Sequence, residues 1–257
     1  MAAADELAAS WRRTRRTQVF PLHPLLGLLG FLGSRHHLVP ASGLRHLLTE
    51  HVGSARLEQL PIPLHVVAVD VLTGEEVLLS SGPVVEAVLA SAAVPGVLPP
   101  MRWGGRELID GGVADNTPIS QAVALGAHEI YVLPTGHACA LQTPPASALG
   151  MSLHALSLLM HARLLADIAM HQDHARLVVL PPPCPLTVSP VDFGHAGYLI
   201  TTALTDARAF LDGGGAARPP IRMGVHQHHT AGGRARRDRI DDRGKTAPPA
   251  VAHRTCA

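Results

Sequence analysis

Aromatic residues are scarce in this chain, at 3% of 257 residues, and there are only three cysteines. A core therefore has to be built from the aliphatic side chains that dominate the 47% apolar fraction. The cysteines, odd in number, stand far apart at Cys139, Cys184 and Cys256. This spacing excludes a disulfide framework and a cysteine metal cluster, and it favours a reducing, cytoplasmic compartment.

The sequence also lacks a long hydrophobic run near its start. No basic segment followed by an apolar stretch is found there, so no secretory signal is expected. The most apolar early stretch, residues 25–32, contains two glycines and is much shorter than the ~20 residues that a membrane-spanning helix needs. We therefore expect no transmembrane segment. Residues 21–40, rich in proline, glycine and leucine, are interpreted as a packed loop or flap.

Lysine is almost absent, because Lys245 is the only one, and arginine supplies nearly all positive charge. The net charge of +1 conceals an acidic body and a basic end: nine arginine or lysine residues and three aspartates lie from Ala216 onward. Residues 213–257 lack apolar periodicity and contain no Phe, Trp or Tyr. Such a composition cannot bury enough apolar surface to fold. We expect a domain over residues 1–212 and a disordered, basic tail over residues 213–257.

Short apolar runs alternate with helical segments along the expected domain. Strands are predicted at residues 64–70, 76–79, 129–133 and 176–180, and helices at residues 4–16, 42–51, 83–93, 118–126, 146–171 and 197–211. Pro83 and Pro118 suit helix starts, since proline lacks only an N–H group that would be unpaired there. Strands separated by helices predict an α/β fold with a largely parallel sheet flanked by helices.

The most informative segment lies at residues 104–118 and reads GGRELIDGGVADNTP. A short apolar run leads to a carboxylate, Asp110, and two glycines follow it. We expect Gly111 and Gly112 to turn the backbone with positive φ and so leave the carboxylate uncovered. An aspartate that only closes an Asx turn needs no such clearance, whereas a catalytic base at the end of a strand does.

This segment, together with the upstream block ASAAVPGVLPP at residues 90–100, closely resembles the Asp-Gly-Gly region of patatin-like phospholipases. The resemblance extends with gaps over residues 5–212 and is densest over residues 64–135, so an ordered set of blocks carries it. It implies a patatin-like α/β domain that hydrolyses fatty-acyl esters of phospholipids or related lipids. It also implies that the reaction needs neither a metal nor an organic cofactor.

The resemblance assigns Asp110 the role of general base in a Ser–Asp dyad, with Gly111 and Gly112 shaping its turn. A serine hydroxyl is a poor nucleophile unless a base lies within hydrogen-bond reach. In this family the serine lies on a Gly-x-Ser-x-Gly elbow and a glycine-rich loop binds the oxyanion, and both precede a helix like that at residues 4–16. Neither motif occurs in this sequence. We therefore expect an N-terminally incomplete domain that is inactive by itself.

Three segments partly resemble the missing motifs. The pentapeptide GMSLH at residues 150–154 has histidine in place of the final glycine, and it follows Asp110 within an expected helix. The glycines at residues 213–215 lie at the border of the tail. Ser91 lies near a helix end and is interpreted as a small packing residue. None of the three is expected to replace the nucleophile.

Seventeen histidines raise the question of a metal site. His154 and His161 are seven residues apart on one expected helix, but no His-Glu-x-x-His pattern accompanies them. Ordinary packing and surface roles account for these histidines. The tail histidines, His226, His228 and His229, suit only adventitious metal binding. We expect no metal site.

The run of arginines at residues 12–16 has two interpretations. Each basic side chain near an anionic lipid surface contributes ~1 kcal/mol, which would support peripheral membrane contact, but a solvated helix end explains the run equally well. The arginines from Arg234 onward have no aromatic neighbours to stack on bases, so no specific nucleic-acid binding is expected. The expected function is that of the lipid acyl hydrolase family. The alternative is a non-catalytic lipid- or protein-binding module, with residues 21–40 as its contact surface.

Overall fold

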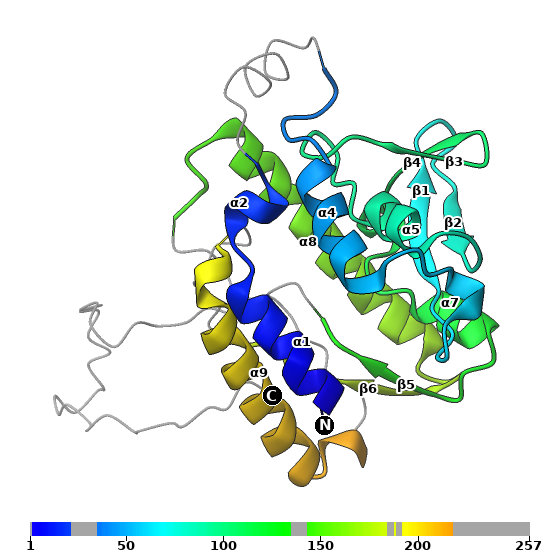
Figure 1. Cartoon of the computed structure of the whole chain (residues 1–257). Coiled ribbons are helices and arrows are strands. Elements are labelled where there is room, and N and C mark those ends of the chain that lie inside the picture. Colours follow the sequence, from blue (N-terminus) through cyan, green and yellow to red (C-terminus); the bar gives the residue numbers. More distant parts are fainter. Residues whose placement is uncertain (1, 22–34, 135–142, 184–187, 189–191, 218–257) are drawn as a thin grey trace, which may run out of the picture.

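A computed structural model describes residues 2–21, 35–134, 143–183, 188 and 192–217 (Figure 1). Most of the predicted flap, all three cysteines and the tail beyond residue 217 lie outside the described residues. Residues 213–217 follow the last long helix and end in a short 3-10 helix.

The described part is a mixed α/β fold. Its α-helices are α1 (Ala2–Arg13), α2 (Arg16–Val19), α4 (Ser42–Val52), α5 (Val84–Ser91), α6 (Gly112–Asp115), α7 (Ile119–Ala124), α8 (Ala148–His171) and α9 (Ala196–Asp212). Its strands are β1 (Val66–Asp70), β2 (Glu76–Leu79), β3 (Met101–Trp103), β4 (Arg106–Asp110), β5 (Glu129–Val132) and β6 (Arg176–Val179), and its 3-10 helices are η1 (Leu57–Gln59), η2 (Phe193–His195) and η3 (Gly215–Ala217). Pro83 and Pro118 precede helices α5 and α7 as predicted.

Four strands form an antiparallel sheet in the order β2-β1-β4-β3. Tight turns explain the antiparallel pairing. Gly74, with φ of 72°, lies in the β1–β2 turn, and Gly104 and Gly105, with φ of 55° and 83°, form a two-residue β3–β4 connection. Two consecutive residues with positive φ suit the turns that match the twist of a hairpin, and such short turns leave no room for a helical crossover.

Among the strands of the described part, only β5 and β6 pair in parallel, and α8 connects them. The sequence predicts a largely parallel sheet, and the structure differs because β1–β2 and β3–β4 are hairpins. Strand β3 is not predicted from the sequence either, since three residues are too few to show a period. The α/β class is confirmed, but the strand pairing is mostly antiparallel.

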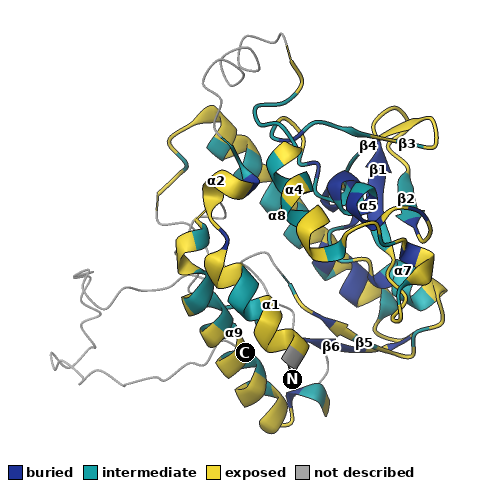
Figure 2. Ribbon diagram, viewed as in Figure 1, coloured by how far each residue is buried: buried dark blue, intermediate teal, exposed yellow. Residues whose placement is uncertain are grey.

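Two aliphatic cores lie between the sheets and the helices that pack on them (Figure 2). The first lies between the four-stranded sheet and α5, and it consists of Leu57, Ala68, Leu79, Val84, Ala87, Ala90 and Leu108. The second lies between the β5–β6 pair and helices α7 and α8, and it consists of Ile119, Val132, Leu164, Ile168, Ala175, Leu177 and Val179. The buried residues of both cores are aliphatic, as the composition predicts, and the partly buried Trp103 packs against the first core.

Helix α8 is long and mostly exposed. Ser147 caps its start by accepting a hydrogen bond from the Gly150 N–H at 3.0 Å. In the described part, α8 is the one helix whose length and mean hydropathy of 1.3 would allow it to cross a membrane, and 17% of that stretch is buried. Core helices of soluble proteins can have the same length and hydropathy, although they are mostly buried, so α8 is weak evidence against the expectation of no transmembrane segment.

Candidate active site

Asp110 is the last residue of β4 and lies opposite Ala68 of β1. Its backbone N–H donates to the carbonyl oxygen of Ala93 at 3.1 Å. Ala93 belongs to the block at residues 90–100, so the fold brings together the two segments on which the family resemblance rests. The prediction that Asp110 lies at the end of a sheet strand is confirmed.

The carboxylate of Asp110 is held by one backbone group. Its Oδ1 accepts a hydrogen bond from the Gly112 N–H at 2.7 Å, and no described residue donates to Oδ2 or forms a salt bridge with the group. Burial raises the pKa of Asp110, and the hydrogen bond from Gly112 opposes this effect. A carboxylate with a raised pKa and no counter-ion is a stronger base than an exposed aspartate.

The two glycines after Asp110 are needed for space rather than for positive φ. Gly111 has φ of −60° and Gly112 is the first residue of α6, so the predicted left-handed turn is wrong. A Cβ atom on Gly111 would lie 2.3 Å from the carbonyl oxygen of Val67, and one on Gly112 would lie 2.9 Å from Asp110 Oδ1. Close approach of the β1 backbone therefore excludes a side chain at Gly111, whereas a side chain at Gly112 would crowd the Asp110 carboxylate and Met160.

A second carboxylate, Asp115, is buried at the end of α6 with 2% of its surface exposed. Its oxygens accept hydrogen bonds from the Thr117 N–H at 3.0 Å and from the Ser120 hydroxyl at 3.2 Å. Burial raises the pKa of Asp115, and the negative charges of Asp167 and Glu76 raise it further. Asp115, five residues after the candidate base, is thus a buried carboxylate whose charged form is disfavoured.

Asp167 of α8 is 1% exposed and completes this acidic cluster. Its Oδ2 accepts from Arg163 Nε at 2.8 Å, while its Oδ1 has no partner among the described residues. The pair lies within α8, which packs against α6, and α6 begins two residues after Asp110. The Arg163–Asp167 pair was not predicted, although an Arg and an Asp four residues apart in an apolar helix indicate such an ion pair.

The serines that were considered as nucleophiles do not contact Asp110. Ser91 is the last residue of α5 and is partly buried, and within the described part no hydrogen bond joins it to Asp110. Ser152 is exposed on α8, where its hydroxyl donates to the Ala148 carbonyl oxygen at 3.0 Å. That neither serine replaces the nucleophile stays a prediction.

One serine–histidine pair was not predicted. The Ser10 Oγ lies 2.6 Å from His51 Nε2, and His51 Nδ1 lies 2.8 Å from the Leu47 carbonyl oxygen. A carbonyl only accepts, so Nδ1 carries the hydrogen and Nε2 accepts from the serine hydroxyl. Ser10 lies inside helix α1, where backbone N–H groups are engaged and cannot bind an oxyanion. The two residues are 41 positions apart, and no local pattern reveals their contact.

His154 and His161 both lie on α8, as predicted. Among the described residues, no group of three or more His, Cys, Asp or Glu side chains is arranged to hold a metal ion. The tail histidines lie outside the described residues. The absence of a metal or organic cofactor therefore stays a prediction.

Comparisons with known proteins agree with the resemblance. The family model named Patatin-like phospholipase matches residues 2–123. An uncharacterized NTE family protein of Mycobacterium tuberculosis (strain H37Rv) is 43% identical over 76 residues, which are 30% of this chain and 21% of that protein. A second such protein of the same strain is 38% identical over 66 residues, 26% of this chain and 11% of that protein. Lysophospholipase NTE1 of Saccharomyces cerevisiae is 29% identical over 86 residues, 34% of this chain and 5% of that protein.

A carboxylate at the end of a sheet strand of an α/β fold, followed by two closely packed glycines, is the arrangement that the resemblance implies. Over residues 2–123, in its N-terminal half, the chain is similar to the patatin-like phospholipase family. It spans about a fifth or less of the length of these curated relatives.

Proposed function

We propose that this chain contributes the general-base half of a patatin-like acyl hydrolase that cleaves fatty-acyl esters of phospholipids or related lipids. The proposal rests on the carboxylate of Asp110, which is partly buried. Among the described residues it has no counter-ion, and none donates a hydrogen bond to its Oδ2. Similarity to the family supplies the lipid substrate class.

In the proposed reaction, a serine hydroxyl transfers its proton to Oδ2 of Asp110 as its oxygen attacks the acyl carbonyl carbon. The tetrahedral intermediate collapses, the alcohol leaves with a proton, and an acyl-serine remains. A water molecule, deprotonated by Asp110, then releases the fatty acid. Gly112 keeps Oδ1 engaged, which directs the free oxygen to the nucleophile.

We also propose that this chain alone is inactive, because its sequence contains no Gly-x-Ser-x-Gly elbow and no oxyanion loop before the first helix. A polypeptide that carries both elements has to complete the site. Loss of a single oxyanion donor already lowers rates about 10²–10³-fold, so loss of donors and nucleophile together leaves no measurable turnover.

Co-production with the N-terminal segment of a patatin-like relative tests the proposal. The segment should carry the glycine-rich loop and the serine elbow, and hydrolysis of p-nitrophenyl esters and phospholipids is measured. We expect activity only when the chain and the N-terminal segment are produced together. In that combination, Asp110→Asn should lower the rate of hydrolysis at least about 10²-fold. Asp173→Asn, which changes an exposed aspartate beyond α8, is the matched control and should retain activity.

A different result would contradict the proposal. Turnover by the chain alone that Asp110→Asn abolishes would mean that another residue is the nucleophile. Ser10→Ala then tests the Ser10–His51 pair directly. Full activity of the Asp110→Asn combination would remove Asp110 from the mechanism.

The alternative function is a non-catalytic lipid- or protein-binding module. Large apolar side chains exposed on α8, including Leu159 at 69% and Met170 at 61%, favour it. A serine-reactive fluorophosphonate separates the two functions. It should label the completed enzyme on its elbow serine and leave a binding module unlabelled.

We further propose that the protein works in the cytoplasm and contacts membranes peripherally. The cytoplasm is inferred from the cysteines, which are odd in number and widely spaced. The membrane contact rests on the lipid substrate class and on the arginines at residues 12–16. Specific nucleic-acid binding forms no part of the proposal, since the basic tail has no aromatic residue.

A further inference from the structure

The arginine run at residues 12–16 lies where one helix ends and another begins. The sequence predicts a single helix over residues 4–16, but α1 ends at Arg13, and Arg15 is extended, with φ of −114° and ψ of 150°. Thr14 is buried and donates its hydroxyl to the Ser10 carbonyl oxygen at 3.0 Å, an alternative to helix continuation. Because the helix is interrupted between Arg13 and Arg16, the arginine side chains on either side point in different directions.

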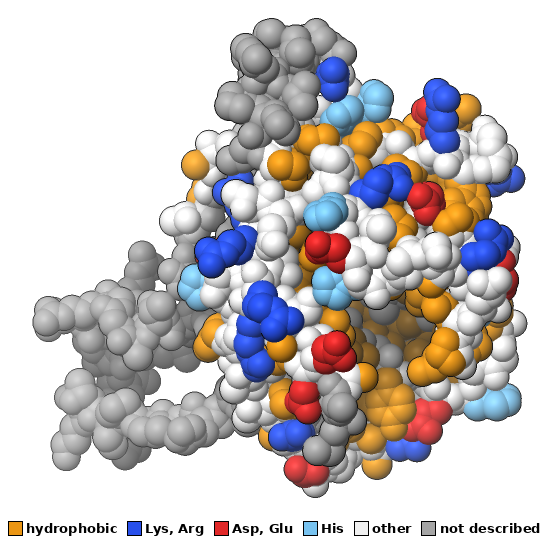
Figure 3. Space-filling view, in the orientation of Figure 1, with side chains coloured by type: hydrophobic (Ala, Val, Ile, Leu, Met, Phe, Trp, Pro, Cys, Tyr) orange, Lys and Arg blue, Asp and Glu red, His pale blue; other side chains and the backbone are white. Residues whose placement is uncertain are grey.

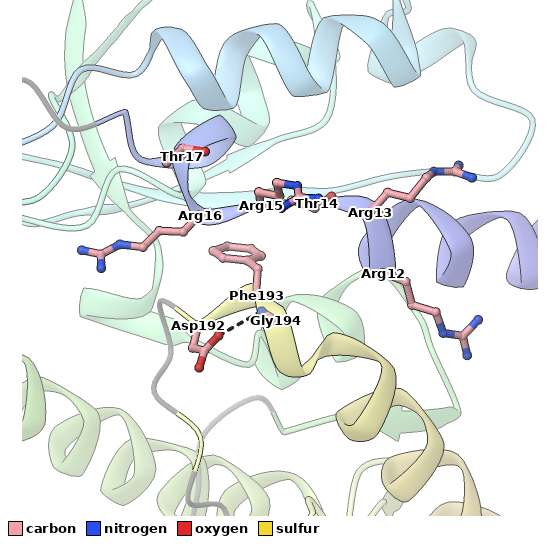
Figure 4. Close-up of a pocket in the computed structure, with 9 residues that line it drawn as sticks. All are labelled: Arg12, Arg13, Thr14, Arg15, Arg16, Thr17, Asp192, Phe193 and Gly194. Atoms are coloured by element: carbon pink, nitrogen blue, oxygen red, sulfur yellow. Dashed lines mark hydrogen bonds between the residues drawn. The ribbon is translucent and has the colours of Figure 1, made fainter.

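A cavity of about 880 Å³ lies at this junction. Its lining consists of Arg12, Arg13, Thr14, Arg15, Arg16, Thr17, Asp192, Phe193 and Gly194. Figure 4 shows the guanidinium groups of Arg12, Arg13 and Arg16 diverging from the chain, with Phe193 between them. We name the surface formed by this lining together with Trp11 the α1–α2 junction.

The four arginines of the junction are exposed and lack acidic partners in the described part of the chain. Asp192 is the one acidic residue in the lining. Its carboxylate accepts from the Gly194 N–H and from His195 Nδ1, both at 2.9 Å, so its charge is engaged within η2. Figure 3 shows arginine side chains at the surface over α1 and α2. The junction therefore presents positive charge to solvent.

Aromatic side chains gather at the same place, in a chain where they are scarce. Trp11 stacks on Phe193 with ring centroids 6.2 Å apart and an interplanar angle of 9°, and Phe20 lies 6.2 Å from Phe193 on a tilted plane. Trp11 is 44% exposed. A half-exposed tryptophan beside basic groups is typical of surfaces that enter the membrane–water interface.

We infer that the α1–α2 junction binds the phosphate-bearing headgroups of anionic phospholipids at a bilayer surface. Divergent guanidinium groups cannot converge on one phosphate, but they suit several headgroups spread over a membrane. A basic patch combined with an apolar insertion is also the two-signal arrangement that holds proteins at membranes. The inference deepens the proposed function, on which its catalytic meaning rests: it identifies where the chain meets its lipid substrate.

Vesicle sedimentation tests this inference on the full chain. Vesicles of phosphatidylcholine alone are compared with vesicles that also contain phosphatidylserine. We expect binding to the anionic vesicles that added salt weakens, because screening shortens the reach of surface charges. In a Trp103→Phe background Trp11 is the remaining tryptophan, and its fluorescence should shift to shorter wavelength on binding.

Paired substitutions locate the surface. Arg13→Gln/Arg16→Gln should weaken binding to anionic vesicles by roughly 25-fold, since ~1 kcal/mol per basic residue corresponds to about fivefold each. Arg35→Gln/Arg102→Gln removes the same charge from exposed positions elsewhere and should cost about twofold or less by the same reasoning. Arg13→Lys/Arg16→Lys keeps the charge and should retain most of the binding.

Several outcomes would overturn the inference. One is equal binding to both kinds of vesicle. Another is an equal loss of binding in Arg13→Gln/Arg16→Gln and Arg35→Gln/Arg102→Gln. A third is a loss of binding in Arg13→Lys/Arg16→Lys as large as in Arg13→Gln/Arg16→Gln. Inorganic phosphate that displaces the protein at concentrations too low to screen charge would assign the cavity to a free phosphate ligand instead.

Failure of the proposed function is distinguishable from failure of this inference, because vesicle binding needs no serine. In the completed enzyme, Arg13→Gln/Arg16→Gln should lower hydrolysis of vesicle lipids and leave hydrolysis of soluble p-nitrophenyl esters unchanged. Selective vesicle binding without any hydrolysis would preserve the inference and reject the hydrolase. An equal loss on both substrates would reject the inference.

Discussion

At the residue scale, the candidate base depends on close backbone packing around one carboxylate. Asp110 is positioned by β4, by its N–H bond to Ala93 and by the Gly112 N–H that holds Oδ1. Gly111 lies against the backbone of Val67, and Gly112 leaves space for the carboxylate of Asp110. Steric and electrostatic changes at these positions are therefore expected to have separable effects on stability and activity.

Gly111→Ala should destabilise the fold and displace the base. The added methyl would lie 2.3 Å from the Val67 carbonyl oxygen, so the backbone has to move, at a cost of about 1–3 kcal/mol for overpacking. Gly126→Ala is the control: Gly126 has φ of 88° and open space around it, so the penalty is backbone strain of ~1–2 kcal/mol. Urea unfolding should detect both changes, but only Gly111→Ala should also lower hydrolysis by the completed enzyme. Equal activity in the two variants would mean that the Gly111 contact does not position Asp110.

Stability and activity should respond to pH in opposite directions. The pKa values of Asp110 and Asp115 are raised above 3.8 in the folded state, chiefly by burial. Each group therefore stabilises the fold below its unfolded pKa, and this contribution is lost as pH rises through the folded pKa. The free energy of unfolding should fall over that window, while activity should rise as Asp110 ionises. Asp115→Asn should flatten the stability curve without moving the activity curve; a flattened activity curve would assign the titration to Asp115.

At the element scale, the acidic cluster lies where α8 packs against α6, the helix that follows the candidate base. Arg163 is half exposed, whereas Asp167 is almost fully buried and has one oxygen without a described partner. The attraction between them offsets the cost of placing Asp167 near Asp115. The packing of α8 on α6 is thus sensitive to charge as well as to apolar contact.

Arg163→Met should lower the free energy of unfolding by about 1–3 kcal/mol, because it leaves Asp167 charged and buried without a partner. Arg163→Met/Asp167→Leu should recover most of the loss, since an apolar pair of similar size carries no desolvation cost. Urea unfolding of both variants provides the measurement. A double variant as unstable as the single one would show that the ion pair itself, rather than the unpaired charge, governs stability.

At the scale of the whole molecule, two sheets with separate cores share one chain. Strand β1 is paired on both sides, by β2 and β4, whereas β5 and β6 pair only with each other in the described part. Tyr131 and Leu133 at β5 are 52% and 66% exposed. Strand edges with exposed apolar side chains favour association with other strands.

The isolated chain is therefore expected to be poorly soluble or molten. Co-production with the N-terminal segment of a patatin-like relative should restore a soluble complex, because added strands pair the open edges and cover apolar surface. Asp110→Asn should remain soluble in that complex. Soluble yield and thermal unfolding are the measurements. A sharp, cooperative transition of the chain alone, as a monomer, would contradict the expectation and favour a self-sufficient non-catalytic domain.

Much of the local structure was predictable because it depends on neighbours in the chain. The bounds of β2, the helices after Pro83 and Pro118, and the strand-end position of Asp110 all follow from apolar periodicity and turn residues. Similarity to the family was predictable for the same reason, since ordered sequence blocks carry it. The prediction of a tail beyond residue 217 stays a prediction.

Tertiary contacts decided the rest. The sequence alone determined most of the strands and longer helices and the position of Asp110 at a strand end, since period and turn chemistry are local properties. Only the folded chain decided that the main sheet is antiparallel, that Gly111 is needed because the Val67 backbone lies so close, and that Ser10 forms a hydrogen bond with His51. Each of these depends on which distant segments touch, and contact between distant segments leaves no periodic trace in the sequence.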